Sequence, residues 1–224
     1  MNRFTSLQLA PYIDHTLLQP AATTAAIVQI CEEALENQFA AVCIPPYYVS
    51  IAAETLKDTP VKVATVIDFP LGYSATASKL AAIKKALVDG ADEIDIVQNL
   101  AAVKNKDWTY ISNETAACLQ PIRLHNKVIK VILETALLTE EELIHCCEIY
   151  AQRKVDFVKT STGFAGEGAT TKVVELMRKY LPDTIGIKAS GGIRTFEFAK
   201  ELIEAGATRI GTSAGVQLMK ATTS

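Results

Sequence analysis

A lysine ends the short apolar run VDFVKT at residues 155–160, and small hydroxyl residues and a glycine follow it at once in TSTG. Side chains alternate along a strand, so Lys159 shares a face with Val155 and Phe157, which belong in a core. A neutral amine can attack an aldehyde and form a Schiff base, which withdraws electrons from a neighbouring carbon–carbon bond. Imine chemistry is therefore one reason to bring a charged side chain to this position.

Two more charged side chains stand at corresponding positions of other short runs, Asp95 in EIDIVQ and Lys188 in TIGIKAS. A nearby cation and partial desolvation both lower the pKa of a lysine, so we expect Lys188 to favour the neutral form of Lys159. One carboxylate and two ammonium groups then meet in one place, with Asp95 offsetting part of the charge. The alternative is that both lysines run from strand ends into solvent and bury only their alkyl chains. The residue types alone leave both interpretations open.

Glycine-rich turns follow the last two of these runs. Gly191 and Gly192 stand between a strand pattern and a helix pattern, and Gly211, Ser213 and Gly215 stand in the matching place one unit later. Glycine lets backbone N–H groups approach an anion, and the start of the following helix favours negative charge. A phosphate site is one interpretation, and tight turns without a ligand are the other. The presence of two such turns favours phosphate.

Eight short apolar runs, each with a segment of helical periodicity beside it, must position these residues. The runs are residues 12–16, 39–44, 61–67, 93–98, 127–134, 155–160, 184–190 and 208–213. Thr139 and Glu142 have the spacing of a capping box at the start of one helical segment. The alternation predicts an α/β protein, a single (β/α)8 TIM barrel with a short N-terminal extra helix, with a doubly wound open sheet as the alternative. In such a barrel the C-terminal strand ends carry the active site, and Asp95, Lys159 and Lys188 stand there.

Composition limits the class of protein. The 224 residues are 49% hydrophobic and contain no Gly-, Ser- or Pro-rich linker, so we expect a single catalytic domain over residues 1–224. A net charge of −3, from 22 basic and 25 acidic residues, gives no basic stripe for nucleic acid and no polybasic segment for a membrane surface. Five cysteines without a secretory pattern indicate a reduced, cytoplasmic protein. No apolar run approaches the roughly 20 residues that span a bilayer.

Six motifs in order along the chain carry a resemblance to a known family. They are IDHTLL, VIDFPLG, ADEIDIV, VILETALLTEEE, VKTSTGF and GIKASGGIRT. The chain resembles the deoxyribose-phosphate aldolases, which are class I, Schiff-base aldolases, and the pairing of KTSTG with a downstream KASGGIR is a specific combination. The resemblance implies reversible cleavage of 2-deoxy-D-ribose 5-phosphate to D-glyceraldehyde 3-phosphate and acetaldehyde, with no metal or other cofactor.

The resemblance also implies roles for individual residues. Lys159 falls on the family's Schiff-base lysine, Lys188 on its second active-site lysine and Asp95 on its proton-relay aspartate. The positions that match the family's substrate site are Asp14, Thr16, Cys43 and Thr162. The positions that match its phosphate loops are Gly163, Gly191, Gly192, Gly211 and Ser213. The implied partners are small molecules, a sugar phosphate and acetaldehyde, and because barrels of this family are often dimeric a homodimer is expected.

Three features depart from the family pattern. Asp68 in VIDFPLG stands where glycine is common. We expect its carboxylate to lie near the barrel mouth and either to weaken phosphate binding or to alter the pKa values of the lysines, and we predict that Asp68→Gly lowers KM for the phosphorylated sugar. Phe164 replaces a lysine that some members use near the phosphate, and the chain ends in QLMKATTS without the aromatic tail that assists proton transfer in many members. These departures bear on rate and phosphate preference rather than on reaction type.

A metal-dependent aldolase has little support in this sequence. Such an enzyme needs several ligands that converge on one ion, and the only histidines are His15, His125 and His145. Cys146 and Cys147 follow His145, but adjacent side chains on a helix point about 100° apart and cannot hold one ion together.

Two other functions stay open, a phosphosugar isomerase that needs no imine and a non-catalytic phosphosugar-binding barrel. Cys43 also has two interpretations. It is either a small buried apolar residue or a site at which reactive aldehydes inactivate the protein.

Overall fold

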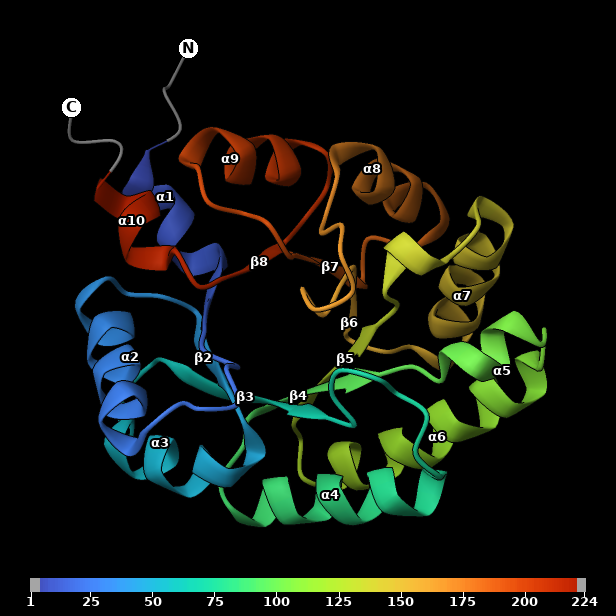
Figure 1. Ribbon diagram of the computed structural model, residues 1–224, viewed down its shortest axis with the longest axis horizontal. Helices are drawn as coiled ribbons and strands as arrows, with labels where there is room; N and C mark the ends of the chain where they lie inside the picture. The colour runs from blue at the N-terminus through green and yellow to red at the C-terminus, as the bar shows by residue number, and fades with distance from the viewer. Residues whose placement is uncertain (1–4, 221–224) are drawn as a thin grey trace.

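Eight parallel strands close into one barrel in the computed structural model, which describes residues 5–220 (Figure 1). The strands are β1 (Ile13–Thr16), β2 (Ala41–Ile44), β3 (Lys62–Ile67), β4 (Glu93–Val97), β5 (Val128–Ile132), β6 (Phe157–Lys159), β7 (Gly186–Ser190) and β8 (Arg209–Thr212). They follow one another around the barrel in sequence order, and β8 pairs with β1 to close it. The predicted TIM barrel is confirmed with one strand inside each predicted run, and the open-sheet alternative is wrong.

Helices form a layer outside the strands (Figure 1). They are α1 (Ser6–Leu9), α2 (Thr24–Glu36), α3 (Val49–Thr55), α4 (Thr76–Val88), α5 (Leu100–Lys104), α6 (Trp108–Leu124), α7 (Glu140–Arg153), α8 (Thr171–Tyr180), α9 (Phe196–Glu204) and α10 (Gly215–Lys220), with 3-10 turns η1 (Ala10–Tyr12), η2 (Pro46–Tyr48) and η3 (Thr135–Leu137). The expected N-terminal extra helix is α1, which packs against α10 beside the barrel. The end of the C-terminal tail, residues 221–224, lies outside the described residues.

Side-chain caps fix where several of these helices begin. The Thr139 side chain accepts a hydrogen bond from the backbone N–H of Glu142, and the Glu142 carboxylate accepts one from the backbone N–H of Thr139, so the predicted capping box of α7 is confirmed. Thr23 caps α2, Asn99 caps α5 and Thr195 caps α9 in the simpler one-bond form. Each such cap stabilises a helix start by about 1 kcal/mol and therefore fixes where the preceding loop ends.

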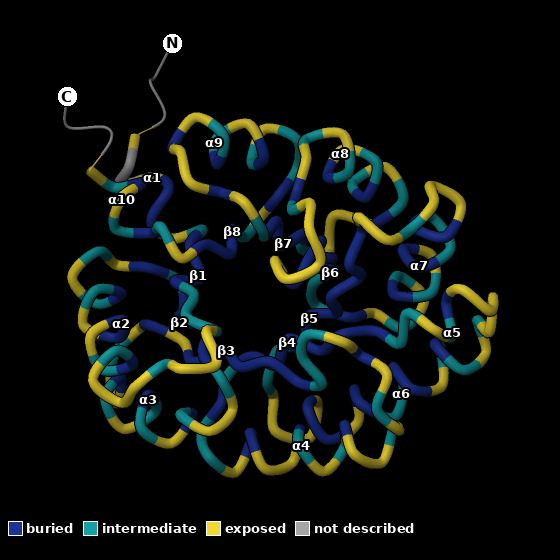
Figure 2. The backbone as a smooth tube through the Cα atoms, viewed as in Figure 1, coloured by how far each residue is buried: buried dark blue, intermediate teal, exposed yellow. Residues whose placement is uncertain are grey.

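The strands are buried on both of their faces, as expected for a parallel sheet covered by helices (Figure 2). The barrel interior is divided by residue type. On β2 and β3 a small apolar cluster of Ala41, Cys43, Ala64 and Val66 packs together. The interior of the other strands holds long charged side chains. The small side chains of β2 and β3 leave room for these charges inside one barrel.

Strand register brings the charged positions side by side. Lys159 on β6 pairs with Lys188 on β7, and Asp95 on β4 pairs with Lys130 on β5. Close packing in the interior requires small residues between them. A Cβ atom at Gly211 on β8 would lie 3.0 Å from Cε of Lys188. The absence of a side chain at Gly211 therefore leaves room for the side chain of Lys188.

Candidate active site

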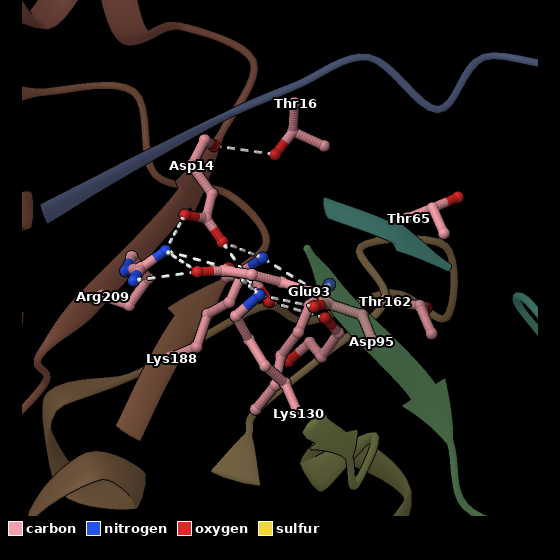
Figure 3. Close-up of polar contacts among 12 residues, drawn as sticks. Asp14, Thr16, Thr65, Glu93, Asp95, Lys130, Thr162, Lys188 and Arg209 are labelled. Atoms are coloured by element: carbon pink, nitrogen blue, oxygen red, sulfur yellow. Dashed lines mark hydrogen bonds and ion pairs between the residues drawn. The ribbon is translucent and has the colours of Figure 1, made fainter. Parts of the chain in front are cut away.

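Seven charged side chains meet inside the barrel, and we call them the charged layer. Figure 3 labels all of them except Lys159. They come from β1 and from β4 through β8 and comprise Asp14, Glu93, Asp95, Lys130, Lys159, Lys188 and Arg209. Apart from Arg209, each is at most 4% exposed. The sequence predicts one carboxylate and two ammonium groups here, whereas the structure joins three carboxylates to four cations. Both predicted lysines are buried, so the alternative in which they extend into solvent is wrong.

Asp95 is the centre of the charged layer. Its Oδ2 atom lies 2.9 Å from Nζ of Lys159 and 2.8 Å from Nζ of Lys188, and its Oδ1 atom lies 2.9 Å from Nζ of Lys130. The two predicted catalytic lysines therefore share one carboxylate oxygen. This places their nitrogen atoms close together, as the prediction that Lys188 acts on Lys159 requires.

Asp14 and Glu93 complete the ion pairs. Asp14 accepts Lys188 at 2.5 Å and Arg209 at 2.6 Å, and Glu93 accepts Arg209 at 3.1 Å and pairs with Lys130. Three carboxylates thus match the charge of Lys130, Lys188 and Arg209. The charged layer is balanced without any charge on Lys159.

The pKa shifts follow from this pairing. Burial by itself would raise the pKa of Asp14 and of Asp95, but the neighbouring cations outweigh it and hold both pKa values below the ordinary range. Burial would likewise lower the pKa of Lys130 and of Lys188, yet the surrounding carboxylates raise both. These four groups are therefore firmly ionised at neutral pH, and the effect of Lys188 on the pKa of Lys159 stays a prediction.

A cavity of about 300 Å³ opens onto the charged layer at the C-terminal ends of the strands. Within the described part of the chain, Lys159 is the one member of the charged layer among its lining residues. Eight of the twelve predicted site residues line this cavity: Thr16, Lys159, Thr162, Gly163, Gly191, Gly192, Gly211 and Ser213. The other four, Asp14, Cys43, Asp95 and Lys188, are not among its lining residues, and each is fully buried.

Backbone contact between two loops shapes one side of the cavity. Gly191 after β7 has φ +89°, and a Cβ atom there would lie 2.8 Å from Cα of Gly168. A Cβ atom at Gly168 would lie only 2.0 Å from the carbonyl oxygen of Gly191, so both positions require glycine. The backbone N–H of Ala169 donates to the carbonyl of Ser190 at 3.0 Å and ties the loops together. Arg194, an exposed cation on the same side, lines the cavity as well.

Thr162 is positioned by a residue to which the sequence assigns no role. Glu134 follows β5, has φ +55° and is 1% exposed. Its carboxylate accepts the backbone N–H of Thr162 at 3.2 Å and also the Thr162 hydroxyl. That hydroxyl accepts the backbone N–H of Phe164 at 3.0 Å, so one short network fixes the start of the loop after β6.

Glu93, Lys130 and Arg209 are the other residues that sequence reasoning missed. All three contribute to the charged layer, and the signal for Lys130 is present in VIKVI, where a charge stands at the centre of an apolar strand. Because alternate residues of a buried strand face the interior, such a charge must find partners inside the barrel. Arg209 begins β8 and gives a weaker signal, since strand ends are often charged.

The surroundings of Asp68 differ from those expected, and those of Cys43 favour one of its two interpretations. The Asp68 carboxylate accepts the backbone N–H of Ser74 at 2.8 Å and the Ser74 hydroxyl at 2.6 Å, and it is not among the cavity lining. Its φ of +56° explains why glycine suits this position. Cys43 is buried in the small apolar cluster, and burial raises the pKa of its thiol, which favours the apolar interpretation.

The adjacent residues His145, Cys146 and Cys147 of α7 do not share one site. His145 stacks on Trp108 with ring centroids 5.0 Å apart, while Cys146 is buried against Gln98. Residues 5–220 contain no group of three or more His, Cys, Asp or Glu side chains arranged to hold a metal ion. In the same range, no helix has the length and apolar character needed to span a bilayer.

Comparisons with known proteins agree with this arrangement. The family model described as DeoC/LacD family aldolase matches residues 9–221. A protein of Thermococcus kodakarensis named deoxyribose-phosphate aldolase is 49% identical to this chain, and the match covers 95% of this chain and 96% of that protein. A protein of the same name from Caldanaerobacter subterraneus is also 49% identical, and that match covers 96% of this chain and 93% of that protein. The tetrameric deoxyribose phosphate aldolase of Aeropyrum pernix matches with a TM-score of 0.92 and 31% identity, over 98% of this chain and 93% of that chain.

Proposed function

Since this chain belongs to the DeoC/LacD family of aldolases, we propose that it is a class I aldolase. Its substrate is 2-deoxy-D-ribose 5-phosphate, which it cleaves reversibly to D-glyceraldehyde 3-phosphate and acetaldehyde. One observation carries the proposal: among the described residues, Lys159 is the member of the charged layer that lines the cavity. An amine that is otherwise buried thus meets a bound aldehyde with little competition from water.

The reaction begins at Lys159. Its neutral amine attacks the C1 aldehyde of the sugar, and loss of water gives a protonated imine. Removal of the C3 hydroxyl proton then breaks the C2–C3 bond, whose electrons move to the imine and form an enamine. Glyceraldehyde 3-phosphate leaves, the enamine carbon gains a proton, and water releases acetaldehyde and regenerates the amine. Because the charged layer is balanced without Lys159, the neutral amine fits the site.

Asp95 and Lys188 are the candidates for proton transfer, acting through a water molecule. Both lie within 3 Å of the reacting lysine or of its carboxylate partner. The low pKa of Asp95 keeps its carboxylate ionised, so it can hold both nitrogen atoms in place throughout the cycle. Asp14 pairs with Lys188 and acts as a positioning residue in this scheme.

The glycine loops after β6, β7 and β8 are the candidate phosphate site. Gly163, Gly191, Gly192, Gly211 and Ser213 line the cavity together, and the exposed cation of Arg194 stands beside them. Backbone N–H groups in glycine turns and a nearby arginine are the groups that usually bind phosphate in barrels. Thr16 and Thr162 line the space between this site and Lys159 and are proposed to contact the sugar hydroxyls.

Trapping of the imine tests the proposal. The protein is incubated with acetaldehyde and sodium borohydride, and its intact mass and peptide map are measured. We expect one reduced ethyl adduct on Lys159, its absence from Lys159→Leu, and acetaldehyde release from the sugar phosphate by the parent protein. Lys79→Met, which removes a buried lysine outside the cavity, is the matched control and should keep the adduct. An unmodified Lys159 in active protein would instead favour a phosphosugar isomerase, and sugar phosphate binding without acetaldehyde release would favour a non-catalytic barrel.

Two further expectations remain proposals. We propose that the protein is a homo-oligomer in the cytoplasm, and the homodimer stays the specific prediction, although the Aeropyrum pernix relative is described as tetrameric. Light scattering of the purified protein gives the number of subunits directly.

A further inference from the structure

The loop after β6 carries an exposed segment at the mouth of the barrel, residues 163–168, which we call the flap. Figure 2 shows an exposed segment between β6 and α8 that projects toward the centre of the barrel. Residues 163–167 are exposed, and Gly163 and Phe164 line the cavity together with Lys159. The flap therefore forms part of the cavity wall.

Both ends of the flap are anchored, whereas its middle is not. Before the flap, the Glu134 carboxylate accepts the backbone N–H of Thr162 at 3.2 Å. After it, the backbone N–H of Ala169 donates to the carbonyl of Ser190 at 3.0 Å. Within the part of the chain that the structure describes, residues 165–167 make no hydrogen bond and no ion pair. The position of the middle of the flap therefore depends on packing.

The ring of Phe164 provides packing for the flap. It meets the ring of Phe69 edge to face, with ring centroids 5.1 Å apart and an angle of 86° between the ring planes. Phe69 lies in the loop after β3, and β4 and β5 stand between β3 and β6 in the barrel. This pair of rings, which we call the clasp, thus joins two loops that are not neighbours and spans part of the barrel mouth.

Local hydrogen bonds support both rings of the clasp. The backbone N–H of Phe164 donates to the Thr162 hydroxyl at 3.0 Å, which fixes the backbone that carries the first ring. The Asp68 carboxylate accepts the backbone N–H and the hydroxyl of Ser74, which closes the loop that carries Phe69. Because each ring has its own support, their contact costs little conformational entropy.

The clasp also separates two hollows. Phe164 lines both the cavity and a neighbouring hollow of about 330 Å³, whereas Phe69 lines that hollow and is not among the residues that line the cavity. Loss of the Phe164 ring would join the two spaces and widen the mouth. Loss of the Phe69 ring would remove the contact and leave the lining of the cavity in place. The two positions therefore distinguish the effect of the contact from that of the cavity lining.

We propose that the clasp holds the flap closed over the bound sugar phosphate, so that Phe69 and Phe164 are positioning residues for the reaction. This inference rests on the proposed function, which supplies the identity of the ligand. Neither ring belongs to the charged layer, so the clasp acts on retention of the substrate and not on proton transfer. An edge-to-face pair changes the equilibrium between a closed and an open flap by about threefold to tenfold.

Proteolysis of the free protein tests the clasp without any need for activity. Glutamyl endopeptidase cleaves after Glu167 of the flap, and cleavage requires that the segment first open locally. We expect Phe164→Ala and Phe69→Ala each to speed cleavage after Glu167 by about threefold to tenfold, as measured by mass spectrometry. The double variant should be cleaved no faster than the faster single variant, because both substitutions remove the same contact.

Steady-state cleavage of 2-deoxy-D-ribose 5-phosphate gives the second measurement. In each single variant KM should rise by about threefold to tenfold while kcat changes by about twofold at most. Phe164→Tyr keeps the ring and should match the parent protein in both constants.

Matched controls come from the loop that carries Phe69. Leu71→Ala and Tyr73→Ala remove exposed apolar side chains of this loop, and neither residue is among those that line the cavity. Both variants should keep the parent values of KM and of the cleavage rate after Glu167. Circular dichroism restricts the comparison to folded protein. If Phe69→Ala does not fold, Phe69→Leu replaces it, because leucine keeps apolar volume without the ring.

Three results would overturn the inference. They are an unchanged rate of proteolysis in both single variants, effects that multiply in the double variant, and a fall in kcat with an unchanged KM. Failure of the proposed function itself is distinguishable, because it abolishes the acetaldehyde adduct on Lys159 and leaves the proteolysis result unaffected.

Discussion

The protein buries lysines in two separate clusters, and only one of them meets a cavity. In the charged layer, Lys159 pairs with Asp95 and lines the cavity. Outside the barrel, Lys79 of α4 is 1% exposed, and its Nζ atom lies 2.9 Å from Glu114 and 3.6 Å from Asp68. Burial and ion pairing are alike at the two lysines, so neither feature distinguishes them. Access to the cavity does, and it is the reason why Lys159 is the proposed nucleophile.

The neighbours of Lys79 explain its structural role. An ammonium group has three donors, and the Lys79 ammonium also donates to the carbonyl of Val97 at 3.0 Å. Its contacts therefore join the end of β4, helix α6 and the loop after β3. Lys79 thus connects the outer helices to two strand ends, whereas Lys159 lines the cavity. Five experiments test this contrast between the two lysines.

Replacement of the reactive lysine should have the largest effect. Lys159→Leu removes the proposed nucleophile, and we expect kcat for cleavage of 2-deoxy-D-ribose 5-phosphate to fall by about 10⁴-fold or more, since no other described amine lines the cavity. A coupled assay of glyceraldehyde 3-phosphate release measures this. Retention of a tenth of the parent kcat would show that the charged layer does not act through Lys159.

The same substitution in the two clusters gives a direct contrast. We expect Lys188→Met to lower kcat by about 10²- to 10³-fold because the proton-transfer pair is lost, and Lys79→Met to change kcat by only a few-fold. Circular dichroism is recorded on both variants so that only folded protein is compared. Equal losses of kcat would remove the distinction between the clusters.

Loss of Lys79 should lower the stability of the protein. Lys79→Met leaves Glu114 as a buried carboxylate without its cation, and we expect the free energy of unfolding to fall by about 3 kcal/mol. Urea denaturation followed by fluorescence measures the loss. The double variant Lys79→Met with Glu114→Leu is the control, and it should recover much of the stability because no unpaired charge remains. No recovery would mean that packing, rather than charge, dominates at this site.

The pH dependence of stability should reflect the charged layer. The pKa values of Asp14 and Asp95 are lowered in the folded state, so the stability they contribute is fully present above the unfolded carboxylate pKa of about 4 and is lost as pH falls below it. The pKa of Lys188 is raised, so its contribution is present below about pH 10 and is lost above. Urea titrations should therefore give a plateau of stability between these limits. A steady decline from pH 7 to pH 5 would contradict the depressed carboxylate pKa values.

The smallest effect is expected for the hydrogen bonds between Glu134 and Thr162. Glu134→Gln keeps the shape of the side chain but weakens its hydrogen bonds to Thr162. We expect KM for the sugar phosphate to rise by about threefold to tenfold with little change in kcat, as loss of a single hydrogen bond predicts. Steady-state kinetics separates the two constants. A large fall in kcat with an unchanged KM would instead place Glu134 in the chemical step.

Local patterns predicted the elements well, because their causes lie within a few residues. The eight runs each contain a strand, and the capping box of Thr139 and Glu142 forms as expected. The charged layer could be predicted only in part. Which charges share a carboxylate depends on strand register, and the pairing of Arg209 with Asp14 depends on closure between the first and last strands. Neither the register of the strands nor the closure of the barrel can be predicted from a short stretch of sequence.

The position of Asp68 shows a second limit. The resemblance by itself predicts that the Asp68 carboxylate weakens phosphate binding. The reason is that Asp68 stands at the C-terminal end of a strand, where the family commonly has glycine and where ligands bind. The structure directs that carboxylate to Ser74, six residues further along the same loop. The side chain compensates locally for a left-handed backbone, which is a common use of aspartate in turns.

The closing ion pair of the barrel has a consequence for synthesis on the ribosome. Asp14 is hydrogen-bonded to cations of the last two strands, Lys188 and Arg209, of which Arg209 lies 195 positions later in the chain, while Lys130 of β5 lies farther from its carboxylate, at 3.7 Å. At ordinary rates of translation that interval is about 10 to 40 s. During it, a half-made barrel that collapsed would bury Asp14 with only the more distant Lys130 as its cation, which is unfavourable. We therefore expect burial of the inner face to be disfavoured until the final strand emerges to close the barrel.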